Sequence, residues 1–227
     1  GGTGAGKTTF ARRLAKILAT RQAVTLVDLE SYFKDFSFLS LPERHQINFD
    51  GPESVDLNRF REDIERLRRG QAIVKPVYDL VTCPRHAGGP VMAPGDVVIA
   101  EGLMPFSNED VRCLYDLRIY IDTPAEVRLR RRLERDVRER GRTLAGAIDH
   151  YMSSVLPAHE CFIEPSKNIS HFVIPGWEDT GNNLNDIVSV IRHSIGQSEN
   201  YKFVCLSPNE KESFSEENIS GQERSAG

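Results

Sequence analysis

The chain has 227 residues, of which 39% are hydrophobic, and its formal net charge at pH 7 is -4. This length suits one globular domain with a sizeable core, and the mildly acidic balance gives no overall case for binding nucleic acid or a membrane surface. The four cysteines lie far apart without a C-x-x-C pair, and no apolar run reaches the length of a membrane span, so we expect a reduced, cytoplasmic protein.

The first eight residues form a phosphate-binding pattern. Gly1-Gly2-Thr3-Gly4-Ala5-Gly6-Lys7-Thr8 matches G-x-x-x-x-G-K-[ST]. The glycines let backbone N–H groups wrap a polyphosphate, Lys7 would reach the outer phosphates, and the Thr8 hydroxyl would hold Mg²⁺. Apolar residues then recur at helical spacing from Phe10 to Leu18, which predicts a helix over residues 7–19. The alternative, a flexible glycine terminus, is weakened by this helix, whose positive end favours an anion.

A buried strand usually leads into such a loop. No residue precedes Gly1 here, so we expect the sequence to be truncated at this point and its loop to lack an anchor. The next strand is predicted from the apolar run 23–27, which ends in an acidic stretch at 28–30. A helix is predicted over 55–69, where apolar residues recur every three or four positions before Gly70.

Residues 71–94 interrupt this alternation. They contain four prolines and the pair Gly88-Gly89, flanked by strand-like pieces at 72–74 and 77–81. This pattern predicts a β-hairpin or flap that projects from the sheet.

The second half of the chain resumes the alternation. Val97–Ala100 is fully apolar, as expected of a strand buried in a parallel sheet, and Pro124 suits the start of a long helix. We expect strands over 97–100, 117–121 and 172–174, and helices over 124–140, 143–156 and 183–195. The alternation predicts an α/β fold with a parallel sheet covered by helices on both faces.

The last part of the chain differs in composition. We expect one domain over 1–196 and a polar, acidic and largely disordered tail over 197–227. Within that tail, residues 201–206 are a candidate for an extra strand.

Acidic residues follow two of the expected strands, where open α/β sheets bind their ligands. Glu101 comes directly after residues 97–100 and would organise Mg²⁺. Asp28 and Glu30 follow the earlier strand, and either could accept the proton of an acceptor hydroxyl, since phosphoryl transfer needs a positioned base. A helix cap or a solvated carboxylate is the alternative for each acid.

The helix that starts at Pro124 is rich in arginine. Arg128, Arg132 and Arg135 share one face. Acidic neighbours, including Asp136, predict an ion-paired surface for most of these arginines, while two or three of them are candidates for a mobile lid over a triphosphate, within residues 124–157. A nucleic-acid patch is disfavoured, because no aromatic residues interleave with the arginines.

Several further segments resemble the uridine–cytidine kinase family. Glu30-Ser31-Tyr32-Phe33-Lys34 resembles its D-S-F-Y-K, Asn48–Pro52 its N-F-D-H-P, Pro76–Asp79 its P-V-Y-D, Asp96–Gly102 its D-V-V-I-x-E-G, Arg135–Arg142 its R-D…E-R-G-R, and Glu164–Lys167 its E-P-[ST]-K. The similarity runs in order over residues 1 to about 195. The related phosphoribulokinases share the scaffold but match these segments less well.

The resemblance implies a P-loop kinase fold and transfer of the γ-phosphoryl group of ATP or GTP, with Mg²⁺, to the 5′-hydroxyl of a pyrimidine ribonucleoside. It also implies self-association, commonly as a tetramer. By position it implies catalytic roles for Glu30 and Lys7, and metal roles for Thr8 and Glu101. It places Gly1, Gly2, Thr3, Gly4, Ala5, Gly6, Lys7, Thr8, Thr9, Arg132 and Arg135 at the phosphates, and Phe33, Phe49, Asp50, Tyr78, Cys83, Arg85, Arg140 and His150 at the nucleoside.

Four positions depart from the family pattern. Glu30 stands where Asp is usual, Phe33 where Tyr is usual, Cys83 where His is usual and His150 where Gln is usual. The extra methylene of Glu30 moves its carboxylate by about 1.5 Å, and such a misplacement can cost about 100-fold in rate. The changes at Phe33, Cys83 and His150 leave two explanations. Either the pocket binds another hydroxyl-bearing acceptor, or His86 or His150 contacts the base in place of the usual residues.

Two alternatives to a uridine–cytidine kinase follow from these departures. One is a kinase for a different acceptor, such as a phosphosugar, and the other is a nucleotide-binding protein of the same fold with weak or lost catalysis. A GTPase switch is disfavoured, because the chain has neither N-K-x-D nor D-x-x-G.

Overall fold

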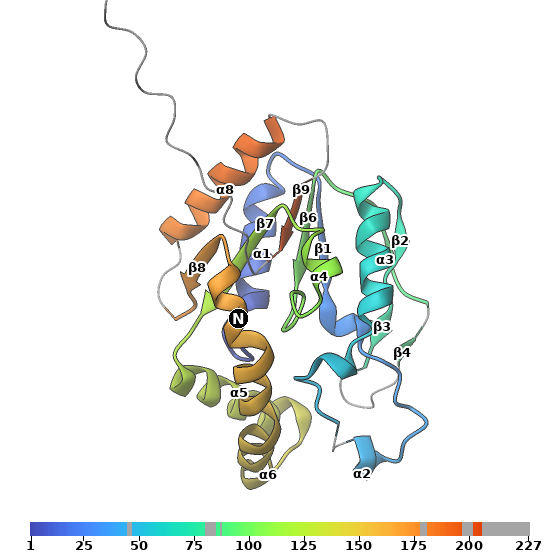
Figure 1. The fold of residues 1–227 in the computed structure, drawn as a ribbon, viewed down its shortest axis with the longest axis vertical. Helices are drawn as coiled ribbons and strands as arrows, with labels where there is room; N and C mark the ends of the chain where they lie inside the picture. The colour runs from blue at the N-terminus through green and yellow to red at the C-terminus, as the bar shows by residue number, and fades with distance from the viewer. Residues whose placement is uncertain (45–46, 80–84, 87, 178–180, 197–201, 206–227) are drawn as a thin grey trace, which may run out of the picture.

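A parallel sheet of five strands forms the centre of the computed structural model, which describes residues 1–44, 47–79, 85–86, 88–177, 181–196 and 202–205 (Figure 1). The strands are β1 (Val24–Asp28), β6 (Val97–Glu101), β7 (Leu117–Asp122), β8 (Phe172–Pro175) and β9 (Lys202–Cys205). Their order is β1-β6-β9-β7-β8, and every neighbouring pair is parallel. The expected α/β fold is confirmed.

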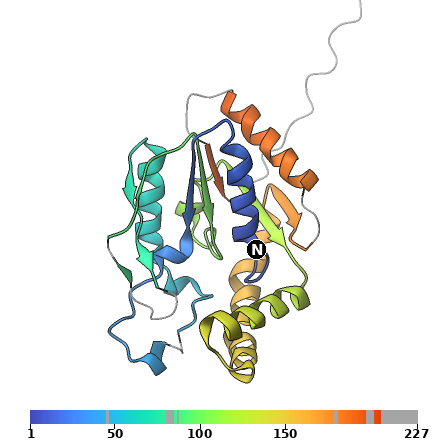
Figure 2. The same cartoon turned by 180° about the vertical axis from the view of Figure 1, so that it is seen from behind.

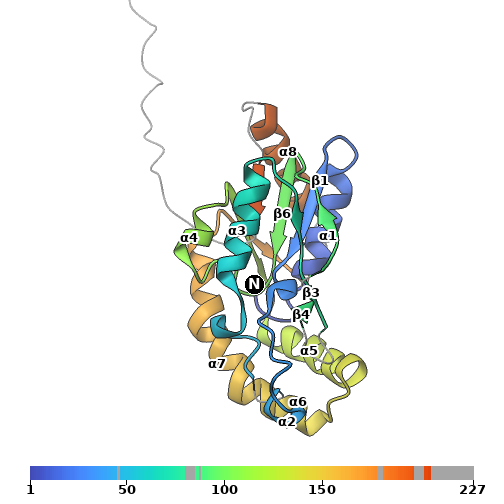
Figure 3. The same cartoon turned by 90° about the vertical axis from the view of Figure 1, so that its right-hand side faces the viewer.

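Helices cover both faces of the sheet, as Figure 3 shows from the side. Side chains alternate along β6, so Val97 and Ile99 face one layer while Val98 and Ala100 face the other. The first layer holds α1 (Lys7–Leu18) and α8 (Gly181–Gly196), which lie side by side in Figure 2. The second layer holds α3 (Leu57–Arg68) and α4 (Glu109–Arg112). Each fully buried aliphatic side chain contributes about 1.5–3 kcal/mol to this packing.

The segment after α3 forms two short antiparallel ladders. β2 (Ile73–Val74) pairs with β5 (Val91–Met92), and β3 (Val77–Tyr78) pairs with β4 (Arg85–His86). The expected hairpin is confirmed, although its strands are shorter than the pattern predicts, and residues 80–84 lie outside the described part of the chain.

The arginine-rich helix α5 (Ala125–Arg140) begins directly after Pro124 and ends at Gly141, whose φ of 66° is the left-handed conformation favoured at a helix C-terminus. In Figure 1 it lies with α6 (Leu144–His150) below the sheet, toward the lower end of the molecule. Leu41–Arg44, a single turn labelled α2, lies at the same end.

The helix expected over 143–156 is longer than predicted. α6 (Leu144–His150) continues through π-helical turns at Tyr151–Val155 and His159–Ile163, which flank the short α7 (Leu156–Ala158), and ends in a 3-10 segment at Glu164–Ile169. Pro157 lacks a backbone N–H, so the regular i→i−4 ladder is interrupted there and the wider turns lie on either side of it.

The candidate strand within residues 201–206 forms as β9 and lies in the interior of the sheet, between β6 and β7. Asp116 holds it through two bonds: its backbone N–H donates to the carbonyl of Phe203, and its Oδ2 accepts from the N–H of Phe203, both at 2.8 Å. Phe203 is buried, and Arg68 lies 5.2 Å from the centre of its ring. Residues 206–227, expected to be disordered, lie outside the described residues.

Within the described ranges, none of the helices combines the length and the apolar character needed to cross a membrane.

Candidate active site

The glycine-rich loop has the backbone geometry of an anion cradle. Gly4 and Gly6 have φ values of 74° and 97°, which residues with a side chain rarely adopt. A Cβ at Gly4 would lie 2.6 Å from the carbonyl oxygen of Arg128, so the loop also packs closely on α5. Because α1 begins at Lys7, the first N–H groups of the helix lack carbonyl partners within it and can bind an anion held by the loop.

One side-chain hydrogen bond closes the loop on itself, and a second connects the start of α1 to β6. The ammonium of Lys7 donates to the carbonyl of Gly2 at 2.8 Å, and the hydroxyl of Thr8 donates to Oε1 of Glu101 at 2.9 Å. Burial lowers the pKa of Lys7 to about 8, although the carboxylates of Glu101 and Glu30 oppose this change. Burial likewise raises the pKa of Glu101, and Lys7 opposes that shift. A hydroxyl beside a carboxylate offers the hard oxygen ligands that suit Mg²⁺, so Thr8 and Glu101 are the residues that would hold it.

Two cavities meet beside the loop. The first, here called the phosphate cavity, has a volume of about 490 Å³ and is lined by Thr3, Gly4, Gly6, Lys7, Thr8, Thr9, Phe10, Arg13, Glu30, Glu101, Leu103, Ile121, Arg131, Arg135 and Gly176. The second, here called the acceptor cavity, has a volume of about 370 Å³ and is lined by Thr3, Glu30, Phe33, Arg44, Phe49, Asp50, Tyr78, Leu103, Arg132, Arg135, Arg140, Gly141, Arg142, Thr143, Gly146 and His150. Thr3, Glu30, Leu103 and Arg135 line both cavities.

The structure distinguishes the two carboxylates at the end of β1. Asp28 accepts hydrogen bonds from the backbone N–H and the hydroxyl of Ser31 and forms an ion pair with Lys75 of the hairpin. Burial acts to raise the pKa of Asp28, but these donors hold it below its usual value. Asp28 thus caps the 3-10 turn Leu29–Tyr32, and that turn carries Glu30 to the boundary of the two cavities.

Aromatic side chains line part of the acceptor cavity. The ring of Phe33 makes edge-on contacts with Phe49 and Tyr78, at centroid distances of 5.1 and 5.3 Å. His150 lines the same cavity, and its pKa is lowered to about 4 by burial and by the positive charges of Arg142 and Arg132. It is therefore neutral at pH 7, with one ring nitrogen as donor and the other as acceptor.

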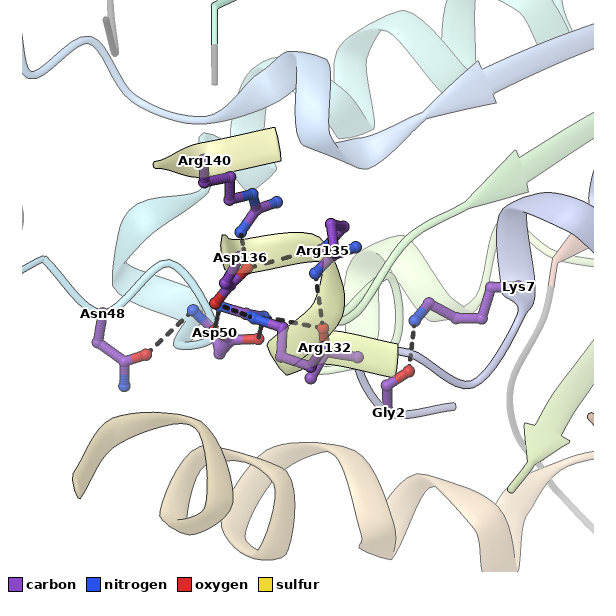
Figure 4. Close-up of polar contacts among 9 residues, drawn as sticks. Gly2, Lys7, Asn48, Asp50, Arg132, Arg135, Asp136 and Arg140 are labelled. Carbon is purple, nitrogen blue, oxygen red and sulfur yellow. Dashed lines mark hydrogen bonds and ion pairs between the residues drawn. The ribbon is translucent and has the colours of Figure 1, made fainter. Parts of the chain in front are cut away.

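A network of buried charges joins the loop to the acceptor cavity (Figure 4). Arg132 forks onto Asp50 at 3.2 and 3.3 Å, and its Nε donates to Asp136 at 2.8 Å. Asp136 also lies 3.4 Å from Arg140, and Arg132 and Arg135 both donate to the hydroxyl of Thr3. The surface expected for most arginines of this helix does not extend to Arg128, Arg132 and Asp136, which are buried, because α5 packs on the loop.

The structure brings most of the expected site residues to these cavities. Gly1, Gly2 and Ala5 support the loop instead: Gly1 packs on the backbone of Ile121, Gly2 accepts from Lys7, and Ala5 accepts from Thr123. Arg132, expected at the phosphates, lines the acceptor cavity alone. Among the described residues expected at the acceptor, Arg85 lines neither cavity, because it pairs with Asp56 at 2.7 Å. Cys83 lies outside the described residues.

Several residues at the cavities are absent from the expected set. In the walls of the acceptor cavity these are Arg44, Leu103, Gly141, Arg142, Thr143 and Gly146, and Asp136 lies behind them. In the walls of the phosphate cavity they are Phe10, Arg13, Leu103, Ile121, Arg131 and Gly176. The Arg-Asp pair at 135–136 and the Arg-Gly-Arg run at 140–142 are signals that point to Asp136 and Arg142. Leu103 and Arg44 stand in stretches that carry no local pattern.

Comparisons with known proteins identify the family of the chain. The profile of the Phosphoribulokinase / Uridine kinase family matches residues 1–181. The chain is 43% identical over 175 residues to a uridine kinase of Halobacterium salinarum, covering 77% of each protein. It is 40% identical over 185 residues to a uridine kinase of Leuconostoc citreum, covering 81% of this chain and 87% of that one.

Two solved structures share the fold. A proposed fructose transport system kinase from Silicibacter sp. TM1040 has a TM-score of 0.63 at 20% identity, with 77% of this chain and 86% of that one covered. The YGR205w protein has a TM-score of 0.52 at 16% identity, with 78% of this chain and 84% of that one covered.

Proposed function

The chain belongs to the Phosphoribulokinase / Uridine kinase family and is a phosphotransferase, and from that premise we propose that it transfers the γ-phosphoryl group of ATP to the 5′-hydroxyl of a pyrimidine ribonucleoside. Curated relatives that are uridine kinases support a nucleoside as the acceptor. The choice of a uridine-like base, of ATP over GTP and of Mg²⁺ belongs to the proposal.

The position of Glu30 is the observation that carries this proposal. Its side chain lines both cavities, with Lys7 and Glu101 on one side and Asp50 on the other. A hydroxyl in the acceptor cavity and a terminal phosphate in the phosphate cavity would therefore meet beside one carboxylate. Asp28 is the other candidate for the proton-accepting carboxylate, but it accepts a hydrogen bond from Ser31 and forms an ion pair with Lys75.

The proposed reaction is a single displacement. The 5′ oxygen attacks the γ-phosphorus, its proton passes to Glu30, and the bond between the γ-phosphorus and the bridging oxygen breaks, so that ADP leaves with the electron pair. Lys7 and Arg135 line the phosphate cavity and would stabilise the charge on the transferring group. Mg²⁺ held by Thr8 and Glu101 would supply further charge neutralisation at the phosphates.

The acceptor cavity supports a nucleoside through its mixed walls. The rings of Phe33, Phe49 and Tyr78 offer apolar surface to a planar base, while Asp50 offers carboxylate oxygens to ribose hydroxyls. Neutral His150 has both a donor and an acceptor for the polar edge of a base.

A second candidate acceptor is a phosphosugar, and one observation favours it. Arg44, Arg132, Arg135, Arg140 and Arg142 line the acceptor cavity, against only two carboxylates, those of Glu30 and Asp50. Asp136 pairs with Arg132 and Arg140 from behind the wall, and the five arginines still outnumber the three carboxylates, which suits an anionic acceptor. Weak or lost catalysis is the remaining alternative, and a cytoplasmic tetramer stays an expectation from the family resemblance.

The experiment is an ATP-consumption assay with Mg²⁺ and a panel of acceptors: uridine, cytidine, purine nucleosides, a sugar phosphate, free sugars and pantothenate. We expect turnover with uridine or cytidine, a product identified as the 5′-monophosphate, and little turnover with the rest. Preference for the sugar phosphate would select the second candidate. Tight binding of Mg·ATP without turnover of any acceptor would select the non-catalytic alternative.

A further inference from the structure

The side chain of Thr3 bridges the two cavities, and we propose that Thr3 is a positioning residue that couples nucleotide binding at the loop to the arrangement of the acceptor cavity. The proposal rests on the proposed function for the identity of the two ligands. Its physical content is a mechanical link between the loop and Asp50, and that link can be measured without any acceptor.

The link begins at the Thr3 hydroxyl, which is almost fully buried, with 4% of the residue exposed. Its oxygen accepts a hydrogen bond from Nη1 of Arg132 at 2.8 Å and another from Nη2 of Arg135 at 3.1 Å. A hydroxyl oxygen has two lone pairs, so both are used by guanidinium donors. Displacing Thr3 therefore acts on both arginines at once.

On the acceptor side, Arg132 transmits such a displacement to Asp50. The guanidinium forks onto both carboxylate oxygens, and the two side chains are only 5% and 2% exposed. Asp136 holds the remaining Nε donor at 2.8 Å, which leaves the planar group little freedom to rotate. Arg132 and Asp50 are thus expected to move together.

On the loop side, Lys7 acts on the peptide unit that leads into Thr3. Its ammonium donates to the carbonyl of Gly2, and that carbonyl belongs to the planar Gly2–Thr3 peptide. Gly2 is buried, and a Cβ there would lie 2.6 Å from Nη1 of Arg128 and 3.0 Å from the ring of His159. A shift of Lys7 toward a phosphate is therefore expected to displace the Gly2–Thr3 peptide and, with it, the side chain of Thr3.

The first test measures amide hydrogen exchange in residues 47–51 with and without Mg²⁺ and a non-hydrolysable ATP analogue. The N–H groups of Phe49, Asp50 and Gly51 are hydrogen-bonded within this loop, so their exchange reports its opening. We expect the nucleotide to slow exchange by about fivefold or more in the wild type and in Thr3→Ser, which keeps the hydroxyl.

Thr3→Val has nearly the same shape but cannot accept either hydrogen bond, so the slowing should disappear in that variant when it is measured at a nucleotide concentration that saturates it. Thr3→Ala serves the same purpose should the valine variant fold poorly. Thr25→Val, which removes a buried and hydrogen-bonded threonine hydroxyl outside both cavities, is the matched control and should keep the slowing. Nucleotide-induced protection that persists in Thr3→Val or Thr3→Ala, or that is absent from the wild type, would overturn the proposal.

The second test compares uridine affinity with and without the same ATP analogue, by calorimetry. We expect the two affinities to differ by about fivefold or more in the wild type and in Thr3→Ser, and to agree in Thr3→Val. An unchanged ratio in Thr3→Val would contradict the coupling. A wild-type chain that binds no nucleoside would refute the proposed acceptor, while the exchange measurement would still decide the role of Thr3.

Discussion

The hydroxyl of Thr8 donates to the carboxylate of Glu101 at 2.9 Å, which joins the first turn of α1 to the end of β6. The two residues are 93 positions apart in the sequence. The contact fixes the Thr8 oxygen at the edge of the phosphate cavity, where we propose that Mg²⁺ binds. Glu101 is therefore expected to act on Mg²⁺ either directly or by orienting Thr8.

Replacing Glu101 by Gln should weaken Mg²⁺ binding more than it weakens nucleotide binding. Loss of such an orienting carboxylate typically costs about 10–100-fold in metal affinity, so the free Mg²⁺ concentration for half-maximal rate should rise by that factor. Initial rates over a Mg²⁺ titration measure it. Glu109→Gln, at an exposed position on α4, is the control, and an unchanged Mg²⁺ requirement in Glu101→Gln would count against the assignment.

Nucleotide use should decline above about pH 8, because burial lowers the pKa of Lys7 to about 8 and the charged form is the one that attracts phosphate. We expect kcat/KM for ATP to fall as the pH rises from 7.5 to 9.5. The effect of pH on folding has the opposite sign. Between about pH 8 and pH 10.5 the unfolded chain binds more protons at Lys7 than the folded chain does, so the contribution of Lys7 to the free energy of unfolding rises with pH.

A pH series of kcat/KM for ATP checks this prediction. Lys7→Arg, whose guanidinium stays charged throughout, should lack the alkaline decline in whatever activity remains. A wild-type profile that stays flat to pH 9.5 would show that Lys7 does not control the alkaline limb.

His150 should affect the acceptor and leave ATP nearly untouched. Removing one polar partner of a buried group costs roughly 1–3 kcal/mol, so His150→Ala should raise the KM for the acceptor by about 5- to 150-fold. His150→Gln, which keeps a donor and an acceptor, should recover most of that loss. A KM for the acceptor that stays unchanged in His150→Ala would exclude His150 from recognition.

The pH profile offers a second check on His150. Because its pKa is lowered to about 4, the imidazole stays neutral from pH 8 down to about 5, and acceptor kcat/KM should show no His150-dependent change across that range. Between about 4 and 6.5 the unfolded chain binds more protons at this histidine, so its contribution to the free energy of unfolding rises with pH. Comparing wild type with His150→Gln isolates this contribution.

The ion pair between Lys75 and Asp28 should stabilise the fold without taking part in the reaction. Lys75→Met leaves a part-buried carboxylate without its ionic partner, and we expect a loss of roughly 1–3 kcal/mol in the free energy of unfolding. Urea denaturation at pH 7 measures it, with Lys16→Met at an exposed position as the control. Equal stability of the two variants would mean that the ion pair between Lys75 and Asp28 adds nothing to the free energy of unfolding.

The stability from Asp28 should also depend on pH. Its pKa is lowered by Lys75 and Ser31 although burial acts the other way, so its contribution is present above about 3.8 and is lost as the pH falls through the lower folded pKa. The difference in stability between wild type and Lys75→Met should therefore shrink in strong acid.

The sequence was sufficient where local signals determine structure. Pro124 precedes α5 because its ring fixes φ, and Gly141 follows α5 because glycine readily adopts the positive φ that ends a helix. The position of β9 could not be predicted in the same way, since it depends on Asp116 and on partners in β6 and β7 that are remote in the chain. Nor could the pattern show that the helix beyond residue 156 continues through π-helical turns.

For the site, sequence spacing could name candidates but could not orient them. Asp28 and Glu30 are two positions apart, and only the turn at Leu29–Tyr32 shows that one is a cap while the other lines the cavities. Asp136 reads as a surface charge on an arginine-rich helix, yet it is 1% exposed, because the neighbouring arginines reach inward toward the loop and Asp50.

The kcat of Glu30→Gln, set beside that of Asp28→Asn, tests the central claim most directly. Loss of a general base costs about 10²–10⁴-fold, so Glu30→Gln should lose that much kcat with uridine or cytidine while still binding ATP. Asp28→Asn should lose stability and keep kcat within a few-fold. If Asp28→Asn loses the activity and Glu30→Gln keeps it, the assignment of the reacting carboxylate is wrong.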